Sequence, residues 1–317
     1  MAETPRLNLP FTGICSFSKL PIWTDLATLE ADVAIIGAPY DQGTQVRAGA
    51  RYGPRAIRQA STIYSLGLGG SYDPERDEIY MDDRWRVVDA GDIDMIHGNT
   101  PACLENIRQA VRQLTARGAL PVIIGGDHSI TAPVVEALDN VGDFAVIQLD
   151  AHLDFVDERG GNRYGQGSPM RRASECPHVK GMAQLGIRGV GSSKRADFEE
   201  ARRRGSRILS VRDIRRMGIP AVIEQLPDCD QYYVTIDIDA MDPALCPGSG
   251  SPSPGGFTYY EVEELMEGIA RRGRVIGFDL VEVAPMYDPT EVTSQTAARM
   301  ILDFIGFILK ERERSGA

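Results

Sequence analysis

From residue 32 onward the chain alternates between short apolar runs and longer amphipathic segments. Short runs rich in Val, Ile and Leu predict buried strands, whereas apolar residues at i, i+3 and i+7 predict helices. In 103–117, for example, Leu104, Ile107 and Val111 share one helical face, and Gly118 is a stop signal. The strands expected are 32–37, 86–89, 120–124, 144–149, 184–187, 207–211, 233–236 and 275–280, and the helices are 103–117, 132–138, 195–204, 219–226, 259–272 and 294–310.

This alternation predicts one parallel sheet. Strands that alternate with helices form βαβ units, and strands apolar along their length suit a sheet covered on both faces. We therefore expect an α/β protein with three layers, αβα, around a mainly parallel central sheet. Residues 1–30 carry scattered prolines without a sustained period and predict an irregular N-terminal arm. No linker or repeat divides 31–317, which is expected to form a single domain.

Composition narrows the class of protein. The 317 residues are 43% hydrophobic and carry a net charge of −11, which argues against a nucleic-acid partner because such a partner needs a basic stripe. An acidic surface is consistent with a cationic substrate, although it also serves solubility alone. No apolar run reaches transmembrane length and no signal peptide is recognisable, so no membrane partner is expected. Five scattered cysteines without a CxxC motif are typical of a cytoplasmic protein.

Two clusters of metal-competent side chains follow predicted strands. Asp150, His152 and Asp154 come after 144–149, and Asp237 and Asp239 come after 233–236. Side chains at alternate positions of an extended chain point the same way, so each cluster presents its members together. Carboxylates gathered in this way are costly to bury unpaired, and bound cations would offset that cost.

A third strand end adds His128, which follows two glycines that permit a tight turn. Parallel sheets place their sites at the carboxyl ends of strands, so these three ends are expected to converge. Each of these three clusters alone has an ordinary explanation, such as a surface strand end or a structural histidine. Their occurrence together at three strand ends favours a metal site. Oxygen ligands with about one imidazole per metal suit two Mn²⁺-like cations, which can hold a bridging hydroxide as nucleophile.

These residues resemble the ureohydrolase family, whose members include arginase, agmatinase and guanidino-acid hydrolases. The resemblance rests on the segments 125–129 (GGDHS), 150–154 (DAHLD), 237–243 (DIDAMDP) and 277–283 (GFDLVEV). It covers roughly residues 30 to 305 and is closer to the agmatinase-like branch than to arginase proper. It implies the arginase-like fold, and it suggests a homo- or hetero-oligomer, a trimer or hexamer.

The resemblance also implies the roles of the site residues. Asp154 would accept a hydrogen bond from the bridging hydroxide, and Glu282 would receive the planar guanidinium of a small cationic substrate. The products would be urea, or a substituted urea, and an amine. Mn²⁺ is the family default, but Ni²⁺ satisfies the same ligands. The implied ligands are His128, Asp150, Asp154 and Asp237 for one metal, and Asp150, His152, Asp237 and Asp239 for the other.

One residue departs from the family pattern. Gln166 stands where the family usually has a histidine that handles the proton of the leaving amine. A neutral amide forms hydrogen bonds but does not titrate near neutral pH. We therefore expect a shifted substrate, either an unusual guanidine or a biguanide such as metformin, which would give guanylurea and dimethylamine. Asn162 and Arg163 are expected to bind substrate, together with an arm at 17–23 at the pocket entrance; a solvated Arg163 is equally consistent with the sequence.

Two other classes remain open from the sequence. The chain is alternatively a low-activity subunit that supports an active paralogue in a hetero-oligomer, which Gln166 favours and the intact ligand set opposes. A single-zinc deacylase on a related fold is the third reading, which the second cluster and Glu282 oppose.

Overall fold

The computed structural model describes residues 9–65 and 70–316. Eight parallel strands form one sheet in the order β4-β1-β5-β10-β9-β6-β7-β8. Their bounds are β1 Val33–Ala38, β4 Val87–Asp92, β5 Leu120–Gly125, β6 Phe144–Leu149, β7 Val179–Leu185, β8 Ser206–Leu209, β9 Gln231–Asp237 and β10 Arg274–Val281. A separate antiparallel hairpin joins β2 (Ser71–Asp73) to β3 (Glu78–Tyr80).

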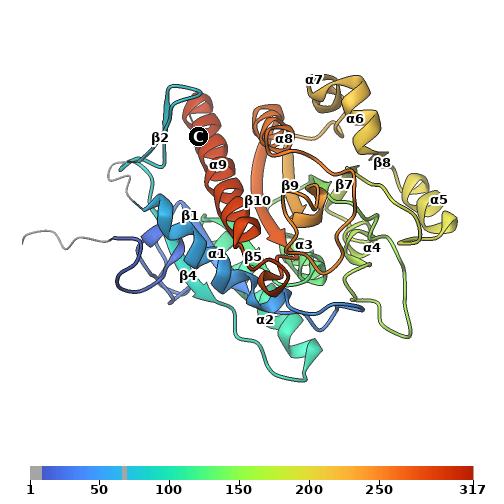
Figure 1. Cartoon of the computed structure of the whole chain (residues 1–317), viewed down its shortest axis with the longest axis horizontal. Helices are drawn as coiled ribbons and strands as arrows, with labels where there is room; N and C mark the ends of the chain where they lie inside the picture. Colours follow the sequence, from blue (N-terminus) through green and yellow to red (C-terminus); the bar gives the residue numbers. More distant parts are fainter. Residues whose placement is uncertain (1–8, 66–69, 317) are drawn as a thin grey trace, which may run out of the picture.

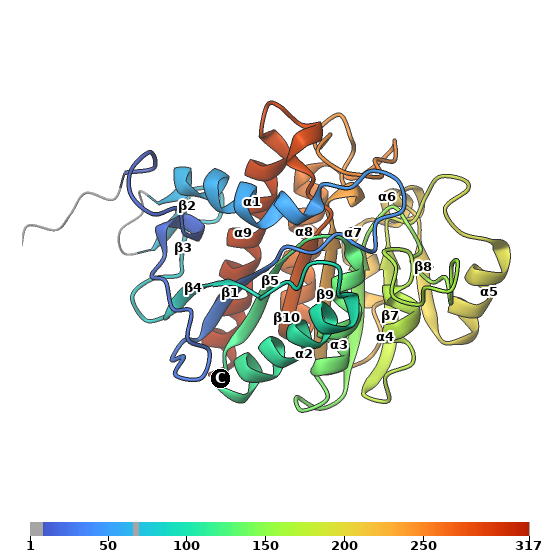
Figure 2. The same cartoon turned by 90° about the horizontal axis from the view of Figure 1, so that it is seen from below.

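Helices cover both faces of the sheet (Figures 1 and 2). Alternate residues of each strand enter different cores; in β1, Val33 and Ile35 join one core and Ala34 and Ile36 join the other. The first core is closed by α1 (Gly53–Ser61), α6 (Val211–Met217), α7 (Ile219–Glu224), α8 (Tyr259–Arg272) and α9 (Val292–Ser315). The second is closed by α2 (Thr100–Ala116), α3 (Thr131–Ala137), α4 (Pro169–Ala173) and α5 (Arg195–Arg203). The predicted three-layer αβα architecture is confirmed.

Helix α9 is long and apolar enough to cross a membrane by length and composition. It is, however, a core helix, because 78% of its most apolar 18-residue stretch is buried inside the fold. It packs against α1 and α8 over the sheet (Figure 1).

Most predicted elements overlap an element of the structure, but the strand expected at 184–187 overlaps only the end of β7, and helix α6 was not predicted. The helix expected at 259–272 has those bounds in α8, whose N-terminus carries a capping box between Thr258 and Glu261. The strand expected at 207–211 ends at Leu209, because Ser210 instead caps α6. Helix α1 was not predicted either. Within the described part of the arm, the chain is irregular apart from a 3-10 turn at Phe17–Lys19; residues 1–8 lie outside the described residues.

The strand order decides where a site can form. The candidate ligands follow β5, β9 and β6, and Glu282 follows β10. These four strands are consecutive neighbours in the middle of the sheet, so their carboxyl ends meet at one edge.

Candidate metal centre

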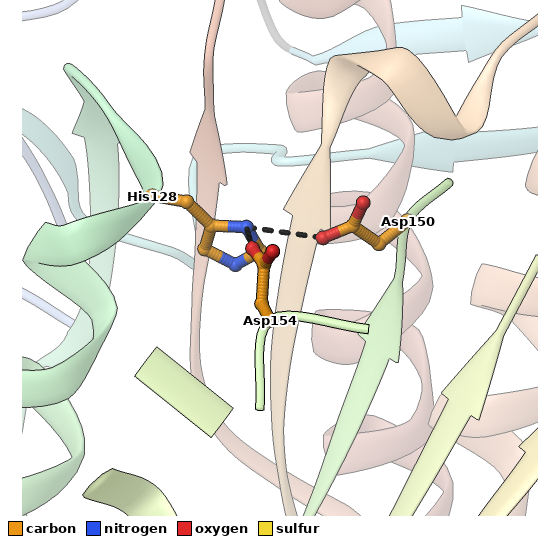
Figure 3. A group of neighbouring side chains, drawn as sticks. All are labelled: His128, Asp150 and Asp154. Carbon is orange, nitrogen blue, oxygen red and sulfur yellow. Dashed lines mark ion pairs between the residues drawn. The ribbon is translucent and has the colours of Figure 1, made fainter. Parts of the chain in front are cut away.

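His128 lies at the centre of a group of carboxylates. Its Nδ1 atom is 3.1 Å from Asp150 Oδ2, 3.0 Å from Asp154 Oδ2 and 3.3 Å from Asp237 Oδ2. Figure 3 shows the imidazole facing Asp150 and Asp154 from the end of β5. The side chains of His128 and Asp150 are fully buried, and those of Asp154 and Asp237 are nearly so. Such a set of one imidazole and three carboxylates suits a divalent cation.

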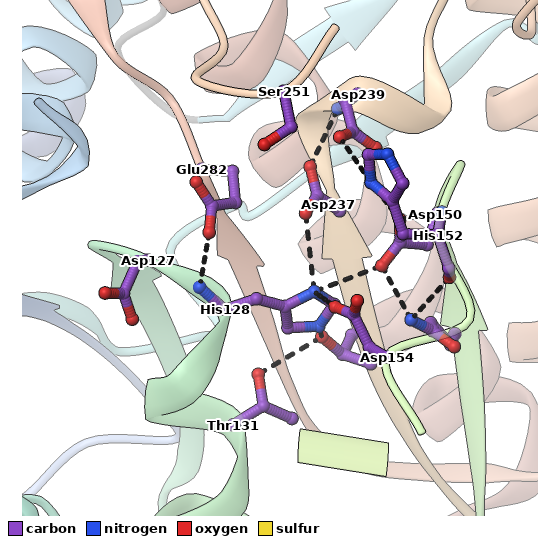
Figure 4. A network of polar contacts seen from close by, with 12 residues as sticks. Asp127, His128, Thr131, Asp150, His152, Asp154, Asp237, Asp239, Ser251 and Glu282 are labelled. Atoms are coloured by element: carbon purple, nitrogen blue, oxygen red, sulfur yellow. Dashed lines mark hydrogen bonds and ion pairs between the residues drawn. The ribbon is translucent and has the colours of Figure 1, made fainter. Parts of the chain in front are cut away.

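A second group lies beside the first (Figure 4). His152 Nδ1 is 3.0 Å from Asp239 Oδ2 and 3.7 Å from Asp150 Oδ1. Asp150 therefore contributes one carboxylate oxygen to each group and lies between them. The structure thus brings together all six residues that the sequence suggested as metal ligands: His128, Asp150, His152, Asp154, Asp237 and Asp239.

Local backbone geometry fixes this arrangement. The backbone N–H of Asp239 donates to Asp237 Oδ1 at 2.8 Å, which turns the chain at the end of β9 so that both carboxylates face the centre. At the end of β5, Gly126 is required because a Cβ there would overlap the carbonyl oxygen of Tyr40. Asp154 and Glu282 both adopt the left-handed conformation, with φ of 50° and 65°. Residues other than glycine rarely adopt such φ values, and they are concentrated at functional sites.

A buried hydrogen-bond chain orients His128. Its Nε2 atom is 2.9 Å from Thr235 Oγ1, and the Thr235 hydroxyl donates to Asp279 Oδ1 at 2.6 Å. Asp279 also accepts hydrogen bonds from Tyr233 and Thr131, so its carboxylate is held as an acceptor. Since Thr235 donates onward to Asp279, its oxygen is free to accept from Nε2–H, and a metal-bound His128 would carry its one proton there and turn the Nδ1 lone pair toward the carboxylates. This tautomer is the one that binds a metal through Nδ1.

A second chain orients Asp150. Gln148 Nε2 donates to Asp150 Oδ2 at 2.6 Å, and Gln184 Nε2 donates to Gln148 Oε1 at 2.6 Å. Ser206 Oγ completes the chain by donating to Gln184 Oε1 at 2.7 Å. The chain crosses β6, β7 and β8, so the edge of the sheet supports a ligand near its middle. The orienting roles of Gln148 and Asp279 were not predicted, although each is a polar residue within an otherwise apolar strand.

The cluster concentrates negative charge away from water. Burial and the charges of Asp154, Asp237 and Asp239 raise the pKa of Asp150 well above its ordinary range. Burial and Asp239 likewise raise the pKa of Asp237 to about 7. Although burial lowers the pKa of His152, the charges of Asp239 and Asp150 outweigh it and raise that pKa to about 11. Positive charge is therefore strongly favoured at this centre.

Two buried atoms identify what kind of positive charge fits. His128 Nδ1 and Asp239 Oδ2 have no hydrogen-bond partner among the described residues. Unpaired buried polar atoms of this kind are uncommon and costly. Because Nδ1 of His128 faces three carboxylate oxygens, either a proton on Nδ1 or a bound cation must lie between them. In the metal-free chain, burial lowers the pKa of His128, but the carboxylates outweigh it and raise that pKa well above its ordinary value. The donor set therefore fits divalent cations.

The centre opens into a cavity of about 240 Å³, which Glu282, Ser251 and Gln166 also line. Glu282 is 4% exposed, and its Oε1 accepts a hydrogen bond from the backbone N–H of His128 at 2.8 Å. Gln166 is half-buried, and its Oε1 atom is buried without a hydrogen-bond partner in the described structure. The predicted positions of Glu282 and Gln166 beside the metal ligands thus agree with the structure.

The other predicted substrate contacts lie elsewhere. Asn162 and Arg163 are exposed and do not line the cavity in the described structure; Arg163 instead pairs with Glu175. The glycines at 160 and 161, both with positive φ, turn the chain back after Arg159, so Arg159 faces the cavity in place of Arg163. The expectation that the arm 17–23 reaches the entrance is wrong, because it runs along β4 at the edge of the sheet.

In this parallel sheet, carboxylates and imidazoles gather at adjacent strand ends, below a cavity. This arrangement is typical of a metal-dependent enzyme of the three-layer αβα class. The model of the arginase family matches residues 31–306, and this chain belongs to that family. The family depends on a binuclear metal centre. The resemblance found in the sequence motifs is therefore confirmed, and the chain is a guanidino hydrolase of the ureohydrolase type.

Individual relatives extend over nearly the whole chain. Guanidinopropionase of Pseudomonas aeruginosa is 35% identical over 320 residues, covering 99% of this chain and 96% of that protein. The solved structure of proclavaminate amidinohydrolase from Streptomyces clavuligerus has a TM-score of 0.84 and 31% identity, covering 95% of this chain and 99% of that chain. Trypanosoma cruzi formiminoglutamase, solved with Mn²⁺, has a TM-score of 0.78 and 25% identity, covering 89% of this chain and 96% of that chain.

Proposed function

We propose that this chain cleaves a C–N bond of a guanidino compound to give urea, or a substituted urea, and an amine. Two divalent cations, Mn²⁺ or Ni²⁺, would be held by the six ligands of the cluster, with Asp150 and Asp237 shared between them. When bound, the cations would lower the pKa of a water molecule and so supply a nucleophile at neutral pH. The observation that carries the proposal is a buried carboxylate, Glu282, in the same cavity as the ligands.

Glu282 is suited to bind the guanidinium. Burial and the charges of Asp237 and Asp127 raise the pKa of Glu282 well above its ordinary range, so a cationic partner is needed to favour its ionised form. A guanidinium supplies that charge and donates two parallel hydrogen bonds to a carboxylate. The backbone hydrogen bond from His128 fixes Glu282 relative to the ligands, so the guanidino carbon would be held beside the cluster. Asp154, which also lines the cavity, would orient the attacking water by accepting its hydrogen bond.

Gln166 favours a second candidate substrate, a dialkyl biguanide such as metformin. Its buried Oε1 is an unused acceptor in the cavity, and a biguanide offers further N–H donors beyond the amidine that reacts. Because an amide does not titrate near neutral pH, Gln166 would position the substrate, and water in the cavity would protonate the leaving amine.

A substrate panel tests the proposal. The purified chain would be loaded separately with Mn²⁺ and Ni²⁺ and assayed with agmatine, 3-guanidinopropionate, 4-guanidinobutyrate, arginine, guanidine and metformin. Release of urea or guanylurea with an equal amount of amine is expected for at least one compound, and the metal-free chain should be inactive. No turnover of any compound by a chain that holds two cations would contradict the proposal.

A further inference from the structure

Arg159 lines the cavity at its exposed side. Among the described residues that line this cavity, it is the one arginine or lysine; the floor consists of the ligands and Glu282. The cavity is therefore polarised, with anionic groups at the floor and a guanidinium at the mouth. A substrate that spans the cavity meets opposite charges at its two ends.

Neighbouring arginines differ from Arg159 in their pairing. Arg163, Arg171 and Arg172 each form ion pairs with Asp157 or Glu175. No carboxylate within 9–65 or 70–316 forms an ion pair with Arg159, although the chain has an excess of acidic residues. Its positive charge is thus available to a ligand, whereas the neighbouring charges serve to fix the loop.

Two neutral contacts hold Arg159 in place. One of its terminal nitrogens donates to Gln45 Oε1, and the other donates to the carbonyl oxygen of Ser192 at 3.3 Å. Gln45 and Ser192 come from two other loops that line the same cavity. The backbone of Arg159 pairs with Asn162 through hydrogen bonds of 3.0 and 3.1 Å, so its own loop is a tight hairpin. The guanidinium is therefore positioned at the mouth without being neutralised.

We propose that Arg159 binds the distal carboxylate of the substrate, so that this chain prefers ω-guanidino acids over guanidines with a cationic or neutral tail. This inference rests on the proposed function, since it assumes that the guanidinium end lies at Glu282. Arginine suits a carboxylate because its planar N–H groups match the two carboxylate oxygens. Ser192 and Ser193 also line this part of the cavity and offer hydroxyl groups to the same carboxylate.

The test compares two substrates of similar length and opposite tail charge, 4-guanidinobutyrate and agmatine. The wild-type chain should have the higher kcat/KM for 4-guanidinobutyrate. Arg159→Gln should raise the KM for 4-guanidinobutyrate about tenfold, the size expected for one charge-assisted contact to carboxylate, with kcat nearly unchanged. The KM for agmatine should stay the same or fall, because a like charge is removed.

Two further variants sharpen the result. Arg159→Lys retains the charge and should keep part of the preference for 4-guanidinobutyrate. Arg195→Gln removes an exposed arginine of α5 that pairs with Glu199, and it should leave both substrates unaffected. Equal changes for the two substrates in Arg159→Gln, or a wild-type preference for agmatine, would overturn the assignment of Arg159 alone. Absence of turnover with every guanidino compound would overturn the proposed function and this inference with it.

Discussion

The chain from His128 through Thr235 to Asp279 leads to a prediction about metal binding. Thr235→Val replaces the hydroxyl that lies 2.9 Å from His128 Nε2 and 2.6 Å from Asp279 Oδ1 with a methyl group of similar size. The N–H of His128 then loses its partner in a fully buried environment. Asp279 keeps the hydrogen bonds from Tyr233 and Thr131, so most of the cost falls on His128.

The size of both effects follows from the hydrogen-bond partner that His128 loses. One buried N–H without a partner costs about 1–3 kcal/mol, so the free energy of unfolding of the metal-free chain should fall by about 2 kcal/mol. His128 also loses the contact that fixes its tautomer and ring orientation, and loss of such a contact weakens metal binding by about 10- to 100-fold. Urea denaturation followed by circular dichroism measures the first quantity, and calorimetric titration with Mn²⁺ measures the second.

Thr131→Val is the matched control. Its hydroxyl donates to the same carboxylate, at 2.9 Å from Asp279 Oδ2, but it does not hydrogen-bond to His128. This variant should lose stability while retaining nearly all of its affinity for Mn²⁺. If Thr235→Val bound Mn²⁺ as tightly as the wild-type chain, or if both variants lost affinity equally, the orienting role of the chain would be refuted.

Four further outcomes are expected. Glu282→Gln should lower kcat/KM for any guanidino substrate at least about tenfold, because the charge-assisted contact is lost, while Mn²⁺ affinity measured by calorimetry stays close to wild type. Removing metal with a chelator should lower the melting temperature. In a thermal-shift titration, the melting temperature should rise with the logarithm of the free metal concentration. Thr258→Ala should reduce the free energy of unfolding by about 1 kcal/mol through loss of the α8 cap. Hydrogen bonds from Arg215 and Thr258 lower the pKa of Glu261 from 4.5 to about 2. The ionised carboxylate therefore stabilises the fold above pH 4.5, and this stabilisation is lost as the pH falls towards 2. In acid denaturation, the free energy of unfolding of Glu261→Gln should depend less on pH across this range than that of the wild-type chain.

The sequence was sufficient to predict the sheet and to predict which residues gather as candidate metal ligands. Short apolar strands between amphipathic segments leave few alternatives to a parallel sheet, and acidic residues that follow such strands meet at one edge. The positions of Asp150 and Asp237 therefore followed from the order of the chain alone. The role of Glu282 could be predicted only from the resemblance to a known family. A single glutamate after a strand belongs to no repeating pattern of residues that would mark it as part of a site.

The loops could not be predicted in the same way. Whether Arg159 or Arg163 faces the cavity depends on the turn made by the two glycines between them, and glycine is compatible with several turns. The arm at 17–23 was misplaced for a similar reason. Its position is set by long-range contacts, such as the hydrogen bond from the backbone of Phe17 to the buried carboxylate of Asp89, which no local pattern encodes.

The left-handed backbone at Asp154 and Glu282 has a consequence for the stability of the folded chain. Each such residue costs the folded state on the order of 1–3 kcal/mol, a cost that glycine would remove. Replacement by glycine at either position would relieve this strain but eliminate a carboxylate of the site, and at Glu282 it would also leave the buried backbone N–H of His128 without its acceptor. The folded state therefore carries backbone strain at two positions whose side chains are acidic groups of the site.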